Sequence, residues 1–471
     1  MKLVWFRNDL RIVDNPALFR ACEDASRSTP CSGLLAVVVL TPEQWFSHDD
    51  SPSKVAFWLA NLTELRRKLQ QLNIPLKVIR GDVFDNTPAS LLQVSHEYNC
   101  DALYFNHEYA LNEQRRDTSV TKLFGDNGIK TFSFHGDVIV PPSEISNQKG
   151  LPYRVFTPFS KSWRRSYLSA NPQPLPAPNI QILTNISSDQ VPRNIEFPNK
   201  EKIGWREDLW PAGEHIAHEK LQGFMAQRVN QYSRDRDYPA LEGTSSLSPY
   251  LTTGVLSARQ CIAGLRANDE SHDWLESQWL TEIIWREFYR HLMAQFPKLN
   301  KWEAFRPEVE NRIVWSDNPV LFAAWCNGET GFSIVDAGMK QLRETGWMHN
   351  RVRMICASFL TKLLRQDWRR GAQFFMQHLV DGDFSSNLGG WQWCASVGAD
   401  SAPYFRIFNP LRQAERFDLF GDYVARWLPE LNSLPGHQRH NAQIAMSVGR
   451  PMPVIDYAKA RAESLSNYQN R

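Results

Sequence analysis

The sequence lacks the signatures of several large protein classes. Its seven cysteines are odd in number and contain no CxxC pair, so neither a disulfide framework nor a cysteine-rich zinc site is expected. The longest apolar run covers residues 34–40, far short of the roughly 20 residues that span a bilayer. The N-terminus reaches Arg7 and Asp9 too early for a secretory signal. These absences predict a cytoplasmic protein in a reducing setting, with no membrane segment.

Common catalytic motifs are also absent. The sequence contains no GxSxG, P-loop or HExxH, and no GxGxxG follows its first apolar segment. Hydrolysis, ordinary dinucleotide binding and metal ligation therefore have no visible machinery. A net charge of +2 does not by itself indicate nucleic-acid binding, although a basic face can exist within a balanced total. What the chain has instead are aromatic, polar and glycine-rich clusters, which are typical of a protein whose bound cofactor carries the chemistry.

A length of 471 residues favours two domains. The first 135 residues alternate continuous apolar runs with helical patterns, which predicts a parallel sheet buried on both faces and covered by helices. We therefore expect a Rossmann-like, doubly wound domain over residues 1–135. Its expected strands are 3–6, 33–40, 76–79, 102–105 and 131–134, and its expected helices are 14–23 (with Asp14 as N-cap), 52–72, 91–98 and 111–124.

A linker is expected over residues 136–202, because its proline-rich part, 171–199, can hold neither a long helix nor a central strand. From residue 203 to 471 the pattern is helical, which predicts an all-α domain large enough to enclose a cofactor. Its clearest expected helices cover residues 278–293, 333–345, 349–364 and 371–380.

Two clusters precede the middle of this domain. The segment 243–248, GTSSLS, follows YSRDRDYP at 232–239; its small residues could approach phosphate oxygens, or they could cap a helix. Glu282, Trp285 and Tyr289 fall on one helical face. A carboxylate beside two aromatic rings suits a flat ring that carries an imide, but an amphipathic helix with a core tryptophan has the same pattern.

Two further clusters follow. In TGWMHNRVRM, Asn350, Arg351 and Met354 share a helical face while Arg353 turns away and could pair with a carboxylate; a solvated basic helix is the alternative. In DGDFSSNLGGWQW, acidic residues flank a glycine, a pattern that can cap a helix, accept hydrogen bonds from a ligand or, less plausibly, bind metal. Trp391 and Trp393 should point in opposed directions if this segment is helical.

Seven ordered motifs, LVWFRNDLR, GTSSLSPYLTTGVLS, WREFYRH, TGWMHNRVRM, DGDFSSN, GGWQW and YFRIFNP, resemble the photolyase/cryptochrome family over nearly the whole chain. More narrowly, they are similar to class I cyclobutane pyrimidine dimer photolyases of the bacterial, folate-carrying type. The resemblance implies an antenna domain over 1–135 and a helical FAD-binding domain over 203–471. It also implies light-driven repair of pyrimidine dimers, a carbon–carbon lyase reaction, by electron transfer from excited reduced FAD to a dimer flipped out of the DNA.

The resemblance assigns roles by motif. The FAD site is Tyr232, Thr244, Ser245, Ser246, Leu247, Ser248, Trp285, Asn350, Arg353, Asp381, Gly382, Asp383 and Asn387. The dimer pocket and its catalytic groups are Glu282, Trp285, Asn350, Met354, Asn387 and Trp393. The DNA contacts are Arg236, Glu282, Trp285, Tyr289, Asn350 and Arg351. An electron-transfer chain is Trp391, Trp368 and Trp315. A 5,10-methenyltetrahydrofolate antenna would contact His48, Asn112, Glu113 and Lys301, and a deazaflavin antenna remains the alternative.

Some features separate neighbouring branches of the family. A (6-4) photolyase would show two histidines where Asn350 and Met354 stand, and single-strand-preferring cryptochromes usually lack this Met354 and Trp393. Ser246 replaces an arginine that many members carry, and Leu388 replaces a common asparagine. We expect a monomer that acts on ultraviolet-damaged DNA without an obligate protein partner. The alternatives are a blue-light photoreceptor of the cryptochrome type and a flavin electron-transfer protein.

Overall fold

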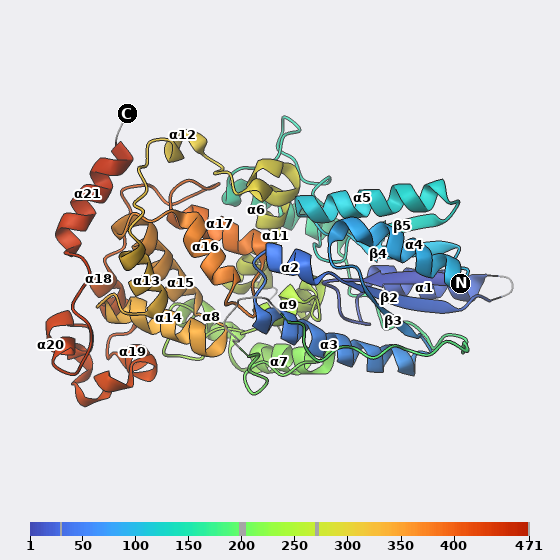
Figure 1. The fold of residues 1–471 in the computed structure, drawn as a ribbon, viewed down its shortest axis with the longest axis horizontal. Coiled ribbons are helices and arrows are strands. Elements are labelled where there is room, and N and C mark those ends of the chain that lie inside the picture. Colours follow the sequence, from blue (N-terminus) through green and yellow to red (C-terminus); the bar gives the residue numbers. More distant parts are fainter. Residues whose placement is uncertain (29–30, 197–203, 269–272, 470–471) are drawn as a thin grey trace. The chain divides into compact units, whose positions relative to one another are not determined.

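The computed structural model describes residues 1–28, 31–196, 204–268 and 273–469 (Figure 1). Its chain forms two compact units, and each is described by itself. The sheet unit comprises Met1–Val229 and Ser245–Pro297, and the helical unit comprises Asn230–Thr244 and Lys298–Arg471. The division into residues 1–135, 136–202 and 203–471 is expected from hydrophobic pattern and composition, whereas the two units are defined by their internal contacts. The expected division stays a prediction.

The sheet unit is built on five parallel strands in the order β3-β2-β1-β4-β5. Lys2 lies opposite Leu34 on one side and opposite Ala102 on the other. This doubly wound topology is the expected fold class for the first part of the chain. The strands are β1 (Lys2–Phe6), β2 (Leu34–Leu40), β3 (Leu76–Arg80), β4 (Ala102–Asn106) and β5 (Lys130–Phe134).

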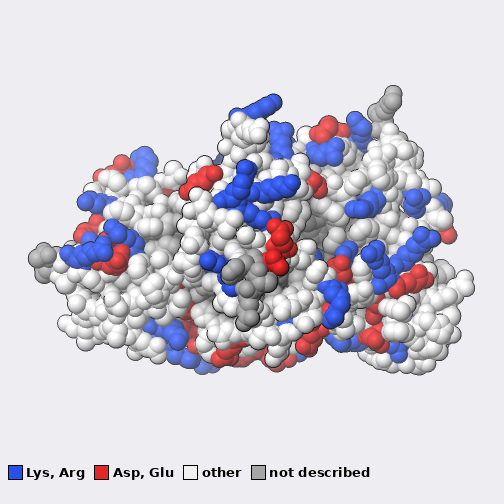
Figure 2. All heavy atoms as spheres, turned by 180° about the vertical axis from the view of Figure 1, so that it is seen from behind, with Lys and Arg blue, Asp and Glu red and all other residues white. Residues whose placement is uncertain are grey.

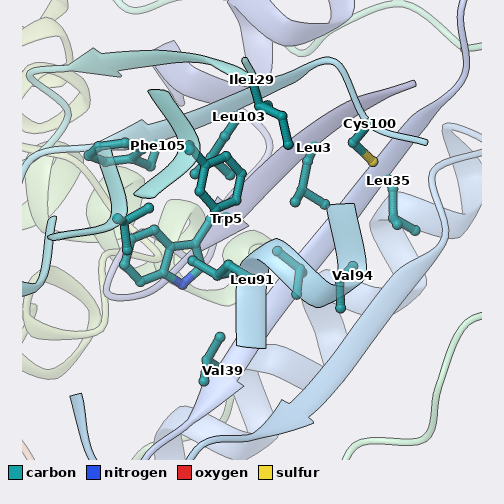
Figure 3. Packing of buried hydrophobic residues seen from close by; sticks show 13 residues of the cluster. Leu3, Trp5, Leu35, Val39, Leu91, Val94, Cys100, Leu103, Phe105 and Ile129 are labelled. Carbon is teal, nitrogen blue, oxygen red and sulfur yellow. The ribbon is translucent and has the colours of Figure 1, made fainter. Parts of the chain in front are cut away.

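Burial differs between the central and the edge strands. All seven residues of β2 and all five of β4 are buried, whereas β5 is largely exposed and β3 is only partly covered. The expectation that every strand is buried on both faces is therefore wrong at the two edges, where each strand has a single neighbour. Alternate residues of the central strands build one core on one face of the sheet: Leu3, Trp5, Leu35, Val37, Val39, Leu103 and Phe105 (Figure 3).

Helices cover this sheet, and α1, α3, α4, α5 and α11 lie where the sequence predicts helices, whereas α6 lies within the expected linker. The first departs at its start: its N-cap is Asn15, whose Oδ1 accepts from the Leu18 N–H at 3.1 Å. Asp14, the predicted cap, instead pairs with Arg259 Nε at 2.9 Å. The helices of the unit are α1 (Pro16–Arg27), α2 (Pro42–Ser47), α3 (Pro52–Gln71), α4 (Thr87–Glu97), α5 (Leu111–Asp126), α6 (Phe156–Ala170), α7 (Glu214–Gln227), α9 (Ser248–Thr252), α10 (Ala258–Ala267) and α11 (Gln278–Gln295).

The proline-rich segment has neither helix nor strand over its described residues, 171–196, as its composition predicts. It is nevertheless fastened to the sheet unit. The Gln181 N–H donates to the Leu72 carbonyl at 2.9 Å, and Asp189 pairs with Lys77 at 3.0 Å. This segment therefore packs against the end of α3 and against β3.

The helical unit contains no β-strand among its described residues, only an isolated bridge between Ser316 and Gln366. One expected helix is divided: α15 ends at Ser358 and continues as a π-helical turn, in which the Leu364 N–H donates to the Phe359 carbonyl at 3.0 Å. The longer helices are α13 (Pro319–Asn327), α14 (Ser333–Thr345), α15 (Asn350–Ser358), α16 (Trp368–Met376), α17 (Phe384–Cys394), α18 (Pro410–Phe417) and α21 (Tyr457–Gln469); the short ones include α8 (Tyr232–Asp235) and α19 (Asp422–Trp427).

Across the described residues of both units, no helix combines the length and the apolar character needed to cross a membrane.

Candidate functional site

An ion pair joins two of the predicted cofactor residues in the helical unit. Arg353 Nη2 donates to both carboxylate oxygens of Asp381, at 3.0 and 2.8 Å, and Arg353 Nε donates to the Met348 carbonyl at 2.7 Å. Asp381 is 5% exposed. A buried carboxylate needs such a partner, because its charge is costly without one. The predicted pairing of Arg353 with a carboxylate is therefore present, and it ties the start of α15 to the segment that precedes α17.

The same segment orients α17. Asp383 Oδ1 accepts from the Ser386 N–H at 2.8 Å and so caps the helix, which was one of the alternatives for this acidic cluster. One turn on, Asn387 Nδ2 donates to the Ala372 carbonyl of α16 at 2.9 Å. This contact fixes which end of the amide is the donor, so Asn387 Oδ1 is the end available as an acceptor.

The tryptophans of α17 differ in environment, as their spacing predicts. Trp391 is 2% exposed, whereas Trp393 is partly exposed. The Trp391 ring lies against Gly371 of α16, where a Cβ would come closer than 3.0 Å to two ring carbons. Trp368 begins α16 one helical turn before Gly371, and its Nε1 donates to Glu310 Oε1 at 3.0 Å. Helix α16 thus links the surroundings of two of the three predicted electron-transfer tryptophans.

The third tryptophan, Trp315, lies on a non-helical segment and is partly exposed. The next residue, Ser316, donates from its N–H to the Arg365 carbonyl at 2.6 Å and forms the isolated bridge with Gln366. The segment that carries Trp315 therefore runs beside the turn that leads into Trp368.

Asn350 and the basic residues near it lie on the accessible side of α15. Asn350 is exposed and Met354 is partly exposed. Arg351 pairs with Asp237 at 2.9 Å, and its guanidinium carbon lies 4.4 Å from the centroid of the Phe417 ring. Arg236 lies 3.8 Å from the same carboxylate. The two predicted phosphate-binding arginines therefore share Asp237, a partner that sequence reasoning did not select although it stands in the quoted motif.

Two buried nitrogen atoms in this region have no hydrogen-bond partner among the described residues: His349 Nε2 and Arg351 Nε. Burial lowers the pKa of His349 to about 4, so its ring is neutral at physiological pH. Its Nδ1 accepts from the Arg351 N–H at 3.1 Å, which leaves a proton on Nε2. Buried donors without partners commonly mark a place for a polar ligand or water. Together with the Arg353–Asp381 pair, they fit a polar cofactor.

In the sheet unit, α11 holds the predicted carboxylate and aromatic residues on one face. The rings of Trp285 and Tyr289 are 5.6 Å apart, and Gln278 Nε2 donates to Glu282 at 2.8 Å. Trp285 is only partly exposed, because the Phe156 ring stacks on it at 3.7 Å with an interplanar angle of 4°. Sequence reasoning missed Phe156, which stands 129 positions earlier and outside every quoted motif.

The opposite face of α11 carries a buried carboxylate, Glu287, which sequence reasoning also missed. Its oxygens accept from the N–H groups of Ile139 and Val140 at 2.7 and 3.3 Å, and from Trp163 Nε1 at 2.6 Å. Burial raises the pKa of Glu287 to about 7, although these donors oppose the shift. The residue fixes the rotation of α11 and hence the face that bears Glu282 and Trp285. Its place inside the WREFYRH motif was the only available signal.

The loop before α9 does not cap that helix in the manner considered above. The N-cap of α9 is Leu247, whose side chain cannot accept a hydrogen bond. Ser246 has φ +52°, a left-handed conformation that turns the loop sharply. Tyr232 is the first residue of α8. The segment Asn230–Thr244 belongs to the helical unit, and the segment Ser245–Pro297 belongs to the sheet unit.

Three of the four predicted antenna residues gather at the start of α5. Asn112 Nδ2 lies 3.0 Å from His48 Nε2, and the His48 ring meets the Phe84 ring edge-on at 5.6 Å. Burial and the nearby Glu108 raise the pKa of Glu113 to about 7. The fourth residue, Lys301, ends a short 3-10 helix of the helical unit and is exposed.

Side chains fill the carboxyl edge of the central strands, where open parallel sheets usually bind their ligands. The guanidinium carbon of Arg7 lies 4.0 Å from the centroid of the Trp5 ring, and that of Arg116 lies 4.7 Å from it. Asp117 pairs with both arginines, at 2.9 and 2.8 Å. These contacts pack two guanidinium groups and an indole ring at this edge.

Comparison with known proteins agrees with this architecture. The family model described as DNA photolyase matches residues 2–179, and the model described as FAD binding domain of DNA photolyase matches residues 279–470. The deoxyribodipyrimidine photo-lyase of Salmonella typhimurium is 41% identical over 99% of this chain and 98% of its own. A bacterial class III photolyase from Agrobacterium tumefaciens superimposes with a TM-score of 0.86 at 33% identity, over 99% of this chain and 96% of its own.

A third relative is an archaeal photolyase from Sulfolobus tokodaii, solved with two FAD molecules. It has a TM-score of 0.81 and 29% identity, and the match covers 100% of each chain. Fold and site together define a two-part flavoprotein, with a parallel α/β part and a helical FAD-binding part. The chain belongs to the DNA photolyase family.

Proposed function

We propose that this protein is a light-driven lyase that splits cyclobutane pyrimidine dimers in DNA. The observation that carries the proposal is the end-to-end match, at 41% identity, to a deoxyribodipyrimidine photo-lyase. The residues that would perform the reaction are present in both compact units. An excited, reduced FAD would supply one electron to the dimer and recover it after the ring splits, so that no net redox change occurs.

The residues proposed to hold FAD are Tyr232, Thr244, Ser245, Ser246, Leu247, Ser248, Trp285, Asn350, Arg353, Asp381, Gly382, Asp383 and Asn387. The orientation of Asn387 supports a reduced cofactor. Its Nδ2 donates to the Ala372 carbonyl, so Oδ1 is the end of the amide that can accept a hydrogen bond from a ligand. Reduced flavin carries a hydrogen on N5 that such an acceptor can bind, whereas oxidised flavin has none there.

The dimer is proposed to bind against Glu282, Trp285, Asn350, Met354 and Trp393. Flat aromatic faces and a carboxylate or amide that can hydrogen-bond an imide edge suit two fused pyrimidine rings. The stacking of Phe156 on Trp285 supports this role, because it holds the indole in one orientation. A dimer must leave the helical stack to reach such a face, and its weakened pairing lowers the cost of flipping.

Arg236 and Arg351 are proposed to bind DNA phosphates, and Tyr289 is proposed as a further DNA contact. On the face shown in Figure 2, basic and acidic side chains are interspersed, in keeping with the net charge of +2. Because Asp237 pairs with Arg351 at 2.9 Å in the free protein, phosphate would have to displace this carboxylate.

An antenna is proposed at His48, Asn112 and Glu113, with Lys301 as a further candidate. The 3.0 Å contact between Asn112 and His48 supports a preformed polar site. A folate is favoured over a deazaflavin or a second flavin, because Arg7, Arg116 and Trp5 fill the carboxyl edge of the strands. The archaeal relative was solved with two FAD molecules, so a second flavin is an alternative antenna to be tested.

The test is repair itself. Purified protein with chemically reduced flavin is mixed with ultraviolet-irradiated duplex DNA, and dimers are counted after blue light and after the same time in the dark. Light-dependent loss of dimers is expected, and Glu282→Gln should slow it because the charged acceptor is lost. Flavin binding without any light-dependent loss of dimers would reject the lyase reaction and favour the photoreceptor alternative.

A further inference from the structure

Trp302 is a tryptophan to which neither the motifs nor the resemblance assigns a role, yet its ring lies against Trp368. The two ring centroids are 6.1 Å apart with an interplanar angle of 33°, and the Trp302 ring also meets the Phe384 ring edge-on at 5.5 Å. Within the described part of the chain, Trp315 makes no ring contact with Trp368. Among the described residues, Trp302 is therefore the tryptophan whose ring contacts the ring of Trp368.

The backbone at Trp302 is held in an unusual conformation to keep the ring there. Its φ is +61°, in the left-handed region that bulky residues rarely adopt. Two hydrogen bonds maintain it: the Trp302 N–H donates to the Leu299 carbonyl at 3.1 Å, and the Trp302 carbonyl accepts from Arg369 Nε at 2.8 Å. Arg369 follows Trp368 directly, so the backbone of Trp302 is bound to the segment that its ring contacts.

The two rings differ in how well they tolerate a positive charge. Trp368 is fully buried, and the guanidinium carbon of Arg369 lies 4.6 Å from the centroid of its ring. Glu310, which accepts from Trp368 Nε1, also pairs with Arg369 at 2.8 Å, so its negative charge is shared. Trp302 is partly exposed, and water can solvate a charge on its ring and accept its indole proton. An electron vacancy on Trp368 would therefore move outward to Trp302.

We propose that Trp302 is a second surface exit of the electron-transfer chain, alongside Trp315. The inference rests on the proposed function and on photoreduction of its flavin. Trp391 would give one electron to the light-excited oxidised flavin, Trp368 would refill Trp391, and Trp302 would refill Trp368. The radical cation left on Trp302 loses its indole proton to water, and an external thiol then returns one electron and one proton. Each transfer moves one electron, and the thiol is the net reductant.

The chain offers a direct comparison of the two exits. Trp302→Phe, Trp315→Phe and the double variant are prepared with oxidised flavin, together with Trp274→Phe, a partly exposed tryptophan of the sheet unit, as the control. Phenylalanine keeps the aromatic packing but is much harder to oxidise. The first measurement is transient absorption of the tryptophan radical after a single flash, without thiol. The second is mass spectrometry of the peptide that carries Trp302 after illumination in air, which detects oxygen addition to its indole.

The expected result is that Trp315→Phe keeps part of the long-lived radical signal and that the double variant loses it. Oxygen addition at Trp302 should depend on light and flavin and should increase in Trp315→Phe. The proposal is overturned if Trp315→Phe alone loses as much signal as the double variant, or if Trp302 gains no oxygen. All variants should repair dimers normally once chemically reduced, since repair needs no tryptophan donor. Absence of repair in the unaltered protein would instead reject the proposed function.

Discussion

Gly371→Ala tests the contact between α16 and Trp391. Its effect on stability follows from the space available for the added methyl group. A Cβ at Gly371 would lie closer than 3.0 Å to two carbons of the Trp391 ring and to Leu360 Cδ2. The ring is 2% exposed, so it can yield only by moving against other buried groups. Overpacking of this kind costs about 1–3 kcal/mol. The helix gains about 0.5–1 kcal/mol when an interior glycine becomes alanine, which offsets part of that cost.

We therefore expect a net destabilisation of about 2 kcal/mol. For a unit of this size, that lowers the midpoint of thermal unfolding by about 4–8 °C. Because relaxation must move Trp391, the rate of flavin photoreduction should fall as well, while repair by chemically reduced protein should change much less. Thermal unfolding and the rate of flavin bleaching under blue light with thiol measure the two effects.

The matched control is Gly223→Ala, also in a helix interior, where nothing lies within 4 Å of the added Cβ. It should be neutral or stabilise the protein by about 1 kcal/mol, and it should leave photoreduction unchanged. If Gly371→Ala behaved like this control in both assays, the close packing of Gly371 on Trp391 would be refuted, and with it the role of α16 in placing the two tryptophans.

Three further predictions concern other parts of the chain. The pKa of Glu287 is raised from 4.5 to about 7, so its contribution to stability is complete below pH 4.5 and should be lost as pH rises through about 7, by about 3 kcal/mol in total. Chemical unfolding at several pH values should show this dependence in the unaltered protein and not in Glu287→Gln. Arg351→Ala should weaken binding of damaged DNA and reduce the salt slope by about 1, whereas Asp237→Asn should strengthen binding by removing the competing carboxylate, as measured by titration at several salt concentrations; equal slopes in all three proteins would exclude the phosphate contact. Asn112→Ala should lower the near-ultraviolet absorption of the antenna relative to that of the flavin without changing repair by light that the flavin absorbs directly, and an unchanged absorption ratio would place the antenna elsewhere.

The elements of the fold could be predicted because their signals are local. Continuous apolar runs located all five strands to within a residue or two, since a central parallel strand must be apolar along its length. Departures occur where a distant residue decides. Asp14 failed as a cap because its carboxylate binds Arg259, 245 positions later. The helix expected at 349–364 gives way to a π-helical turn after Ser358, and periodicity does not reveal such a turn.

The candidate site was predictable where motif residues contact each other and unpredictable where they contact something else. Spacing alone suggested that Arg353 would find a carboxylate, and it binds Asp381. No spacing could suggest Phe156 as the ring that stacks on Trp285, because an aromatic contact leaves no trace at either position. Asp237 was visible in the sequence, but its role as the partner of Arg351 depends on how α8 and α15 meet.

Tryptophan shows the limit most clearly. Seventeen are present, and composition cannot separate those that pack a core from those that carry an electron. A tryptophan within an electron-transfer chain needs an aromatic neighbour on each side and an environment that tolerates a transient positive charge. Both are properties of tertiary contacts. Trp302 has ring contacts with both Trp368 and Phe384, and Trp368 has one with Trp302, although 66 positions separate the two tryptophans. They differ in the second, because one ring is enclosed and the other reaches solvent. That difference in solvation determines that the positive charge moves from Trp368 to Trp302. Solvation depends on the tertiary structure, and the spacing of these residues in the sequence does not reveal it.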